Sequence, residues 1–160
     1  MTKDNLKIYD LLDEMHHDAD CELNFNSPFE LLVAVVLSAQ CTDKRVNQVT
    51  SELFKIANTP EAFVKMPVEE LERHIFSCGF YHNKAKAIKS LSQSVSDMGG
   101  MPKSRDELMK LQGVGRKTAN VVAAVAYGEN AIAVDTHVFR VANRIGLAHA
   151  KTPEQTEQQL

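Results

Sequence analysis

Helix-start signals recur along the whole chain and constrain its fold more than any other feature of the sequence. In each signal a Ser or Thr is followed by Pro at the next position or by Glu three residues on, and its hydroxyl oxygen can cap the first helical turn. Four are present: Ser27-Pro-Phe-Glu30, Thr59-Pro-Glu61, Ser104-Arg-Asp-Glu107 and Thr152-Pro-Glu-Gln155. No segment has the alternation of a convincing strand. The sequence therefore predicts an all-α fold.

Glycines end several of the predicted helices. The helix from Ser27 runs as a buried helix to Leu37, and one that begins at Pro67 stops at Gly79. Two longer amphipathic segments follow, one ending at Gly99-Gly100 and one closed by Gly128. The first is indicated by apolar residues at helical spacing, namely Ala87, Ile88, Leu91 and Val95. The second is indicated by the apolar run through Ala126.

Two further helices are predicted near the end of the sequence. Asp135 caps one that extends to about Ile145. The last helix, from Thr152, contains few residues before the sequence ends, and so short a helix has little to bury. We expect it to fray, and we expect the sequence to be a fragment or a form that lacks its C-terminal end.

The composition is that of a soluble globular protein, with 44% hydrophobic and 24% charged residues in 160. No apolar run reaches membrane-spanning length, and the N-terminus has no signal-peptide pattern, so we expect an intracellular protein without a membrane partner. Cys21, Cys41 and Cys78 lack metal-ligand spacing, which predicts reduced thiols and no metal site.

The charge is unevenly distributed. Residues 1–80 carry 7 basic and 14 acidic side chains, for a net charge of −7, whereas residues 81–160 carry 11 basic and 7 acidic side chains, for a net charge of +4. The overall charge of −3 does not indicate a nucleic-acid-binding protein, but a local basic face can be hidden within such a total.

The segment LQGVGRKTANVV, residues 111–122, combines a glycine turn with a helix start. Glycines let the backbone turn tightly and approach a ligand, and the first amides of a helix lack intrahelical partners. Gly113, Gly115 and Arg116 are therefore candidates for a phosphate site that reads no sequence. The alternative is an ordinary packing corner in which the glycines serve only steric needs.

Lys117 stands in the first turn of that helix, where a cation is disfavoured. Burial against Val121 would further favour the neutral amine, which is a nucleophile toward a sugar aldehyde. The alternative is an exposed lysine that contacts a phosphate. Asp135 follows 18 residues later; it can cap its helix and can also orient a nucleophile or stabilise a developing cation.

The segments LQGVGRKTANVV and AIAVDTHVFRVANR resemble the helix-hairpin-helix and Gly/Pro-Asp signature of the endonuclease III family of DNA glycosylases. The resemblance extends to ELNFNSPFELLVAVVLSAQCTD and GFYHNKAKAI, and so covers nearly all of the chain. It implies a helix-hairpin-helix glycosylase fold. Residues 26–129 would form a six-helix lobe with the hairpin at about 104–127, and residues 1–25 and 130–160 would form part of a second lobe.

The resemblance also implies a bifunctional enzyme of base excision repair, which removes oxidised pyrimidines and then cleaves the abasic strand. Lys117 is then the nucleophile that forms a Schiff base at the sugar C1′, and Asp135 assists departure of the base. The related enzymes that remove mismatched adenine usually lack this lysine. Damaged double-stranded DNA is the expected partner of a monomer in the bacterial cytoplasm, associated with the nucleoid.

Several further residues match DNA-contacting positions of the family. Gln40 matches the residue that fills the space left by a base turned out of the duplex, and Phe80 stands where relatives often carry a Leu wedge. Asn83 and Lys84 are candidates for phosphate contacts, and His137 for a DNA contact. The alternatives are structural: Gln40 would cap a helix, Phe80 would pack in the core and His137 would serve packing alone.

The family typically ends in four cysteines that hold a [4Fe-4S] cluster, and the three cysteines of this chain do not supply that set. We therefore expect no cofactor in this chain. Two other functions stay open at this point, a non-catalytic helix-hairpin-helix module that binds DNA, and a helical domain that binds proteins.

Overall fold

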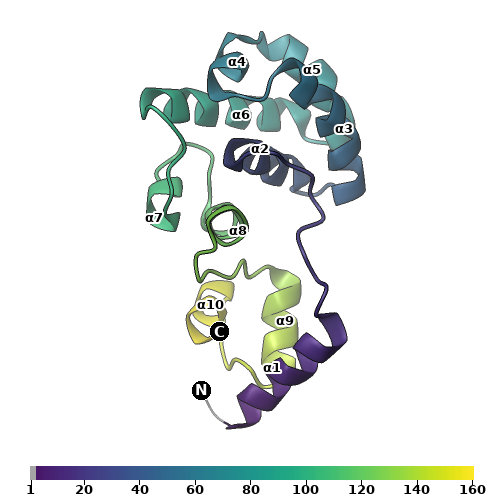
Figure 1. The fold of residues 1–160 in the computed structure, drawn as a ribbon, viewed down its shortest axis with the longest axis vertical. Helices are drawn as coiled ribbons and strands as arrows, with labels where there is room; N and C mark the ends of the chain where they lie inside the picture. Colours follow the sequence, from purple (N-terminus) through teal and green to yellow (C-terminus); the bar gives the residue numbers. More distant parts are fainter. Residues whose placement is uncertain (1–2) are drawn as a thin grey trace. The chain divides into compact units, whose positions relative to one another are not determined.

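A computed structural model describes residues 3–160, and every regular element within that range is a helix. The predicted all-α fold is confirmed (Figure 1). The elements are α1 (Lys3–His16), α2 (Pro28–Ser38), α3 (Asp43–Ile56), α4 (Pro60–Lys65), α5 (Val68–Ile75), the 3-10 turn η1 (Phe76–Cys78), α6 (Tyr81–Asp97), α7 (Arg105–Leu108), α8 (Arg116–Tyr127), α9 (Thr136–Arg144) and α10 (Pro153–Gln159). Helices α1 and α3 were not among the predicted elements.

The four predicted hydroxyl caps are confirmed. The side chains of Ser27, Thr59, Ser104 and Thr152 each accept a hydrogen bond from a backbone N–H in the first turn of the helix that follows. The Glu30 carboxylate, itself 3% exposed, accepts a 2.6 Å bond from the N–H of Asn26 and completes the cap of α2. These local bonds determine where α2, α4, α7 and α10 begin.

The chain divides into two compact units. One comprises the chain up to Cys21 together with Ile132–Leu160, and the other comprises Glu22–Ala131. The larger unit therefore contains α2 to α8, and the smaller contains α1, α9 and α10.

Helix α2 forms the centre of the larger unit and contacts α3, α6 and α8 (Figure 1). Its side chains Leu31, Leu32, Val33 and Leu37 are fully buried. This packing accounts for the uninterrupted apolar run in the sequence, because a helix surrounded by others has no face left for polar residues. Helix α6 packs on α4 and α5, and its buried face includes Ile88, Leu91 and Val95.

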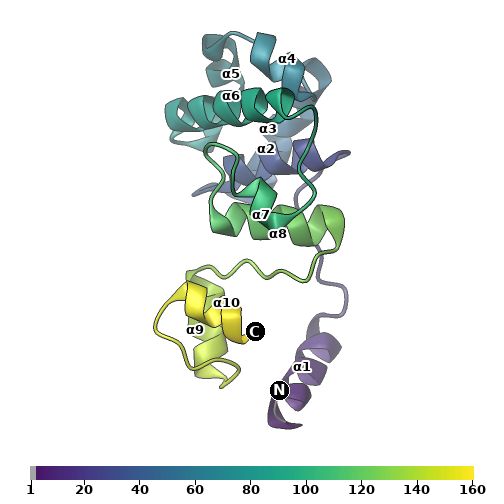
Figure 2. The same ribbon diagram turned by 90° about the vertical axis from the view of Figure 1, so that its left-hand side faces the viewer.

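In the smaller unit α9 packs against α10, which Figure 2 shows next to each other. Ala142, Leu147 and Ala148 form a small core against which Ile8, Tyr9 and Leu160 pack. Helix α10 is formed over Pro153–Gln159, and contrary to the expectation that it has little to bury, it contributes to this packing. Thr156 is fully buried, and the Nδ2 amide of Asn143 approaches its hydroxyl at 3.5 Å, so this short helix has a packing partner.

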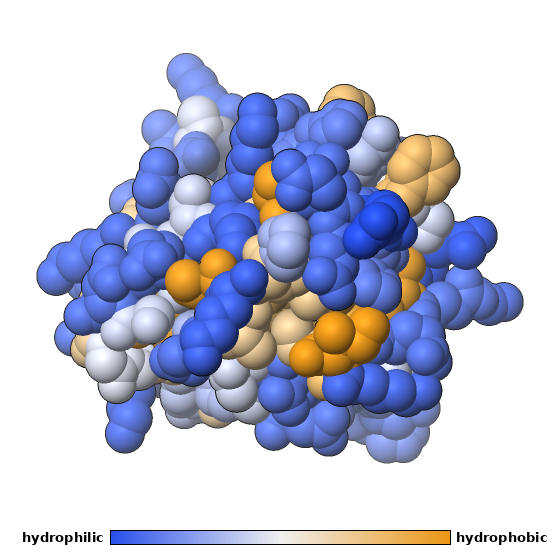
Figure 3. All heavy atoms as spheres, turned by 90° about the horizontal axis from the view of Figure 1, so that it is seen from above, coloured by the Kyte–Doolittle hydropathy of each residue, from blue (hydrophilic) through white to orange (hydrophobic). Residues whose placement is uncertain are grey.

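The surface in Figure 3 is mainly hydrophilic, with small, separate groups of apolar side chains. Among the residues that the structure describes, no helix is both long and apolar enough to cross a membrane. Most of the leucines of the larger unit lie in its core instead.

Candidate active site

The hairpin α7–turn–α8 places the glycine turn at the surface of the larger unit (Figure 2). Leu111 and Val114 are 2% and 7% exposed and anchor the turn in the core, while Gln112, Gly113 and Gly115 are exposed. The turn is thus fixed by its two apolar residues and presents its backbone to solvent.

Gly113 is required by the geometry of this turn. Its φ is +83°, and a Cβ added there would lie 3.4 Å from the Cβ of Ala87 on α6. A larger residue would be strained in this conformation and would also crowd α6. Gly115 has an ordinary φ of −86° and open space around it.

Helix α8 begins without the side-chain cap found at the Ser and Thr starts. Gly115 occupies its N-cap position and makes no side-chain cap hydrogen bond. No side chain of the N-cap residue therefore covers the start of α8, where the first amides lie at the positive end of the helix dipole. Such an N-terminus can bind an anion such as a phosphate.

Lys117 is exposed, so of the two alternatives left open by the sequence the structure favours the exposed lysine over one buried against Val121. The buried residues of α8 are Ala119, Asn120, Val122 and Ala123, and the helical repeat places Lys117 on the opposite side. The consequence is that a substrate in solution can reach the amine without any rearrangement of the core.

A hollow of about 310 Å³ brings residues from α2, α6 and the glycine turn together. Gln40, Phe80, Asn83, Lys84 and Gly113 all line it, and the remaining lining residues are Val35, Val36, Ala39, Ala87 and Thr118. No feature of the sequence indicated that Val35, Val36, Ala39, Ala87 and Thr118 would line this hollow, because they come from three different helices.

Gln40 and Phe80 share an unusual backbone conformation. Their φ values of +53° and +45° are the positive values among described residues other than glycine. Such values cost an L-residue about 1–2 kcal/mol, and they concentrate at functional sites. Phe80 is 66% exposed, so its ring does not pack in the core, and Gln40 is exposed as well.

Lys84 differs from its neighbour Asn83, which is exposed. Its side chain is 6% exposed, and its Nζ donates hydrogen bonds to the carbonyl oxygens of Leu37 at 2.9 Å and Cys78 at 2.7 Å. Because the ammonium group is bonded inside the protein, the predicted phosphate contact is not supported. Lys84 instead holds η1 against the end of α2.

Asp135 caps α9, as predicted. Its Oδ1 accepts hydrogen bonds from the N–H groups of His137 at 2.9 Å and Val138 at 2.8 Å. The His137 side chain is exposed, with its Nδ1 3.4 Å from the guanidinium of Arg140. Both residues belong to the smaller unit, whereas Lys117 belongs to the larger.

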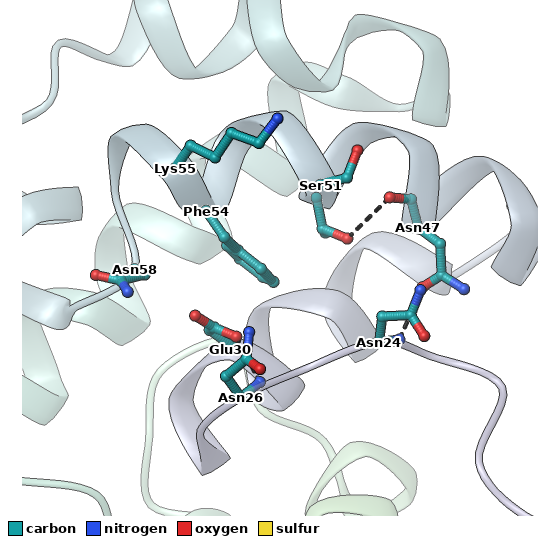
Figure 4. A pocket seen from close by; sticks show the side chains of 9 residues that line it. Asn24, Asn26, Glu30, Asn47, Ser51, Phe54, Lys55 and Asn58 are labelled. Atoms are coloured by element: carbon teal, nitrogen blue, oxygen red, sulfur yellow. Dashed lines mark hydrogen bonds between the residues drawn. The ribbon is translucent and has the colours of Figure 1, made fainter.

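A second hollow, of about 230 Å³, lies between α3 and the segment before α2 (Figure 4). The Asn47 side chain accepts a 2.8 Å hydrogen bond from the N–H of Asn24 and donates one of 2.8 Å to the carbonyl of Glu22. Asn26 and Glu30 join at its other side. The two hydrogen bonds of the Asn47 side chain hold the segment before α2 in place. The polar residues of ELNFNSPF therefore have a structural role.

The cysteines of this chain do not fit a [4Fe-4S] cluster, which needs four thiolates. The chain has three cysteines, and Cys21 lies in the other unit from Cys41 and Cys78. Within residues 3–160 no group of three or more His, Cys, Asp or Glu side chains is arranged to hold a metal ion.

Comparison with known proteins places this geometry in a family. Residues 33–160 match the HhH-GPD superfamily base excision DNA repair protein family. Endonuclease III of Bacillus subtilis (strain 168) is 55% identical over 144 residues, which are 89% of this chain and 66% of that protein. Endonuclease III of Escherichia coli (strain K12) is 46% identical over 157 residues, 97% of this chain and 74% of that protein.

Among solved structures, a trapped endonuclease III–DNA covalent intermediate, an estranged-adenine complex, superimposes with a TM-score of 0.92 at 50% identity. The match covers 100% of this chain and 78% of that one. A non-covalent endonuclease III–DNA complex has a TM-score of 0.91 at 49% identity, over 99% and 77% of the two chains. The chain therefore belongs to the endonuclease III family of base-excision DNA repair enzymes, which are bifunctional DNA glycosylases and AP lyases.

Proposed function

We propose that this chain removes oxidised pyrimidines from double-stranded DNA and cleaves the resulting abasic strand through a Schiff base on Lys117. The observation that carries the proposal is the exposed Lys117 one residue into a helix that starts at a glycine turn without a side-chain cap. A phosphate bound at this helix start would hold the adjoining sugar beside the amine. The relative that was solved as a covalent intermediate with DNA supports a covalent route.

In the proposed reaction the neutral amine of Lys117 attacks the sugar C1′, and the bond to the damaged base breaks. Loss of the ring oxygen from C1′ opens the sugar and leaves an imine between C1′ and the lysine nitrogen. The imine acidifies the C2′ proton, and its removal expels the 3′ phosphate by β-elimination. Water then hydrolyses the imine and returns the free amine.

Asp135 is proposed to stabilise the positive charge that develops on the sugar as the base departs. The N–H groups of His137 and Val138 both donate to its Oδ1, and these two bonds hold the carboxylate at the start of α9. A carboxylate that is held rigidly in this way needs little reorganisation when the charge appears.

The remaining contacts are proposed for binding. Gln40 and Phe80 would enter the space left by the extruded base, since both are exposed at the rim of one hollow. Gly113, Gly115, Arg116 and Asn83 would contact the phosphate backbone, and His137 would add a contact from the smaller unit. Phosphate contacts of this kind make binding salt-dependent.

We further propose that the chain acts as a monomer on damaged double-stranded DNA in the bacterial cytoplasm, in association with the nucleoid. The endonuclease III proteins named above come from bacteria. No step proposed here requires a [4Fe-4S] cluster.

The proposal is tested by borohydride trapping on a duplex that contains one abasic site. The parent chain should form a covalent adduct and Lys117→Gln should form none, because the amide cannot make an imine. Lys65→Gln, which changes another exposed lysine at the end of α4, serves as the matched control and should trap like the parent. Salt-sensitive binding without an adduct in the parent would instead indicate a non-catalytic DNA-binding module.

A further inference from the structure

Cys41 and Cys78 meet where two turns of the larger unit come together. Cys41 lies in the turn after α2, directly before the N-cap of α3, and its N–H donates to the carbonyl of Ser38 at 3.0 Å. Cys78 ends the 3-10 turn η1, which packs against α3. The Cys41 thiol lies near enough to Cys78 to act on it, although Cys78 comes 37 positions after Cys41 in the sequence.

The two thiols differ in their access to solvent. Cys78 is 1% exposed, whereas Cys41 is half-buried. Burial raises the pKa of Cys78 to about 11, and the adjacent Cys41 thiol raises it further, against the opposing charges of Lys84 and Arg45. A reagent from solvent therefore reaches Cys41 first, and Cys78 remains a protonated thiol beside it.

The backbone around the pair is already held in place. Lys84 donates to the carbonyl oxygens of Leu37 and Cys78, and so ties the end of α2 to η1 without any contribution from the thiols. The two turns that carry the thiols thus adjoin at a junction held by Lys84, and a disulfide between Cys41 and Cys78 requires these turns to draw closer together.

We propose that Cys41 and Cys78 form a reversible disulfide that alters the surface presented by Gln40 and Phe80. Gln40 immediately precedes Cys41, and Phe80 follows Cys78 by two residues. Both carry a positive φ and line the same hollow, so a change in either turn is transmitted directly to them.

A peroxide supplies the oxidising equivalents. The Cys41 thiolate attacks one peroxide oxygen, the O–O bond breaks, and Cys41 becomes a sulfenic acid as one water forms. The Cys78 sulfur then attacks the Cys41 sulfur, and the departing hydroxide takes the Cys78 proton as a second water. Two thiols have lost two electrons and two protons, and a dithiol such as dithiothreitol reverses the change.

A disulfide replaces the contact between the thiols by a bond of about 2 Å, which draws the two turns together. The effect on DNA rests on the proposed function, in which Gln40 and Phe80 enter the duplex. Since a misplacement of about 1 Å can cost up to roughly 100-fold in a positioned site, we expect the oxidised chain to bind abasic DNA about 5- to 10-fold more weakly.

The disulfide is tested first, without DNA. The full chain is treated with hydrogen peroxide, remaining thiols are alkylated, and peptides are mapped by mass spectrometry. We expect a peptide in which Cys41 is linked to Cys78, and its loss after dithiothreitol. Cys21→Ser, the matched control, should leave the link intact, whereas Cys41→Ser and the smaller change Cys78→Ala should each abolish it.

A result in which Cys41 and Cys78 are both alkylated after Cys21 has been oxidised would overturn the proposal, as would a link that forms only between two chains.

The regulatory part is tested by fluorescence anisotropy on a labelled duplex with an abasic-site analogue. Weaker binding that dithiothreitol restores, and that Cys41→Ser does not show, supports it; unchanged binding by the linked chain overturns it. A reduced chain that binds no DNA counts against the proposed function instead, since the mapping of the disulfide is independent of DNA.

Discussion

The ammonium group of Lys84 donates a 2.7 Å hydrogen bond to the carbonyl oxygen of Cys78, within a junction where both side chains are almost wholly buried. This bond and its counterpart to Leu37 explain how two strained turns, at Gln40 and Phe80, stay close together. Strain at functional positions persists only where the surrounding structure over-determines it.

Lys84→Met should therefore destabilise the chain. Two buried carbonyl oxygens would lose a charged donor, and hydrogen bonds to charged groups contribute about 1.5–3 kcal/mol each, partly offset by the relief of a buried charge. We expect urea denaturation to show a loss of about 2 kcal/mol. Lys86→Met, which changes an exposed lysine on the same helix, should have little effect. Equal stability of the two variants would contradict this assignment of Lys84.

Gly113→Ala should be far more harmful than Gly115→Ala. Alanine at Gly113 must adopt a φ of +83° and crowd Ala87, whereas Gly115 has an ordinary φ and open surroundings. The left-handed conformation alone costs about 1–2 kcal/mol. Thermal denaturation followed by circular dichroism should show the difference. The Gly113 interpretation is wrong if both variants unfold at the same temperature.

Asp135→Asn and Asp135→Ala separate capping from chemistry. Asn is as good an N-cap as Asp, so Asp135→Asn should keep the stability of α9, whereas Asp135→Ala should lose about 1 kcal/mol. Both variants lack the carboxylate, and we expect both to lose excision of oxidised bases. Denaturation curves and single-turnover excision assays measure the two effects; full excision by Asp135→Asn would leave the residue with a structural role only.

Phe80→Gly should weaken DNA binding without destabilising the fold. Glycine relieves the positive φ of this exposed position, and this gain offsets the greater freedom of glycine in the unfolded chain. We expect unchanged stability and weaker binding to a duplex with an abasic-site analogue, measured by anisotropy. Phe76→Ala, another exposed phenylalanine near the start of α6, should bind like the parent, and similar losses in both variants would argue against a specific wedge.

The stability of the reduced chain should fall in alkaline solution because of Cys78. Its pKa rises from 9.0 to about 11 on folding, chiefly by burial. A raised pKa means that the folded state favours the thiol, so this contribution is complete below pH 9 and is lost as the pH rises toward 11. Two pKa units correspond to about 2–3 kcal/mol. Urea denaturation between pH 8 and 11 should show a smaller decline for Cys78→Ala than for the parent, and parallel declines would exclude Cys78 as the source.

By itself the sequence determined where many helices begin and where the glycine turn lies. Caps such as Ser27 and Asp135 act on amides two or three residues away, so their effect can be read without knowledge of the fold. Helix α3 lacks the Ser/Thr-Pro start, and its Thr42 cap passed unnoticed. The resemblance to a family supplied the positions of Gln40 and Phe80 and the role proposed for Lys117.

Only the tertiary structure decided which side chains of these helices are buried. Lys84 and Lys117 both follow helix starts, yet packing buries the first among backbone carbonyls and leaves the second in solvent. The hollow shared by Gln40 and Phe80, and the meeting of Cys41 with Cys78, likewise depend on contacts between distant segments. The physical reason is that burial and proximity are properties of packed surfaces, which local spacing along the chain does not encode.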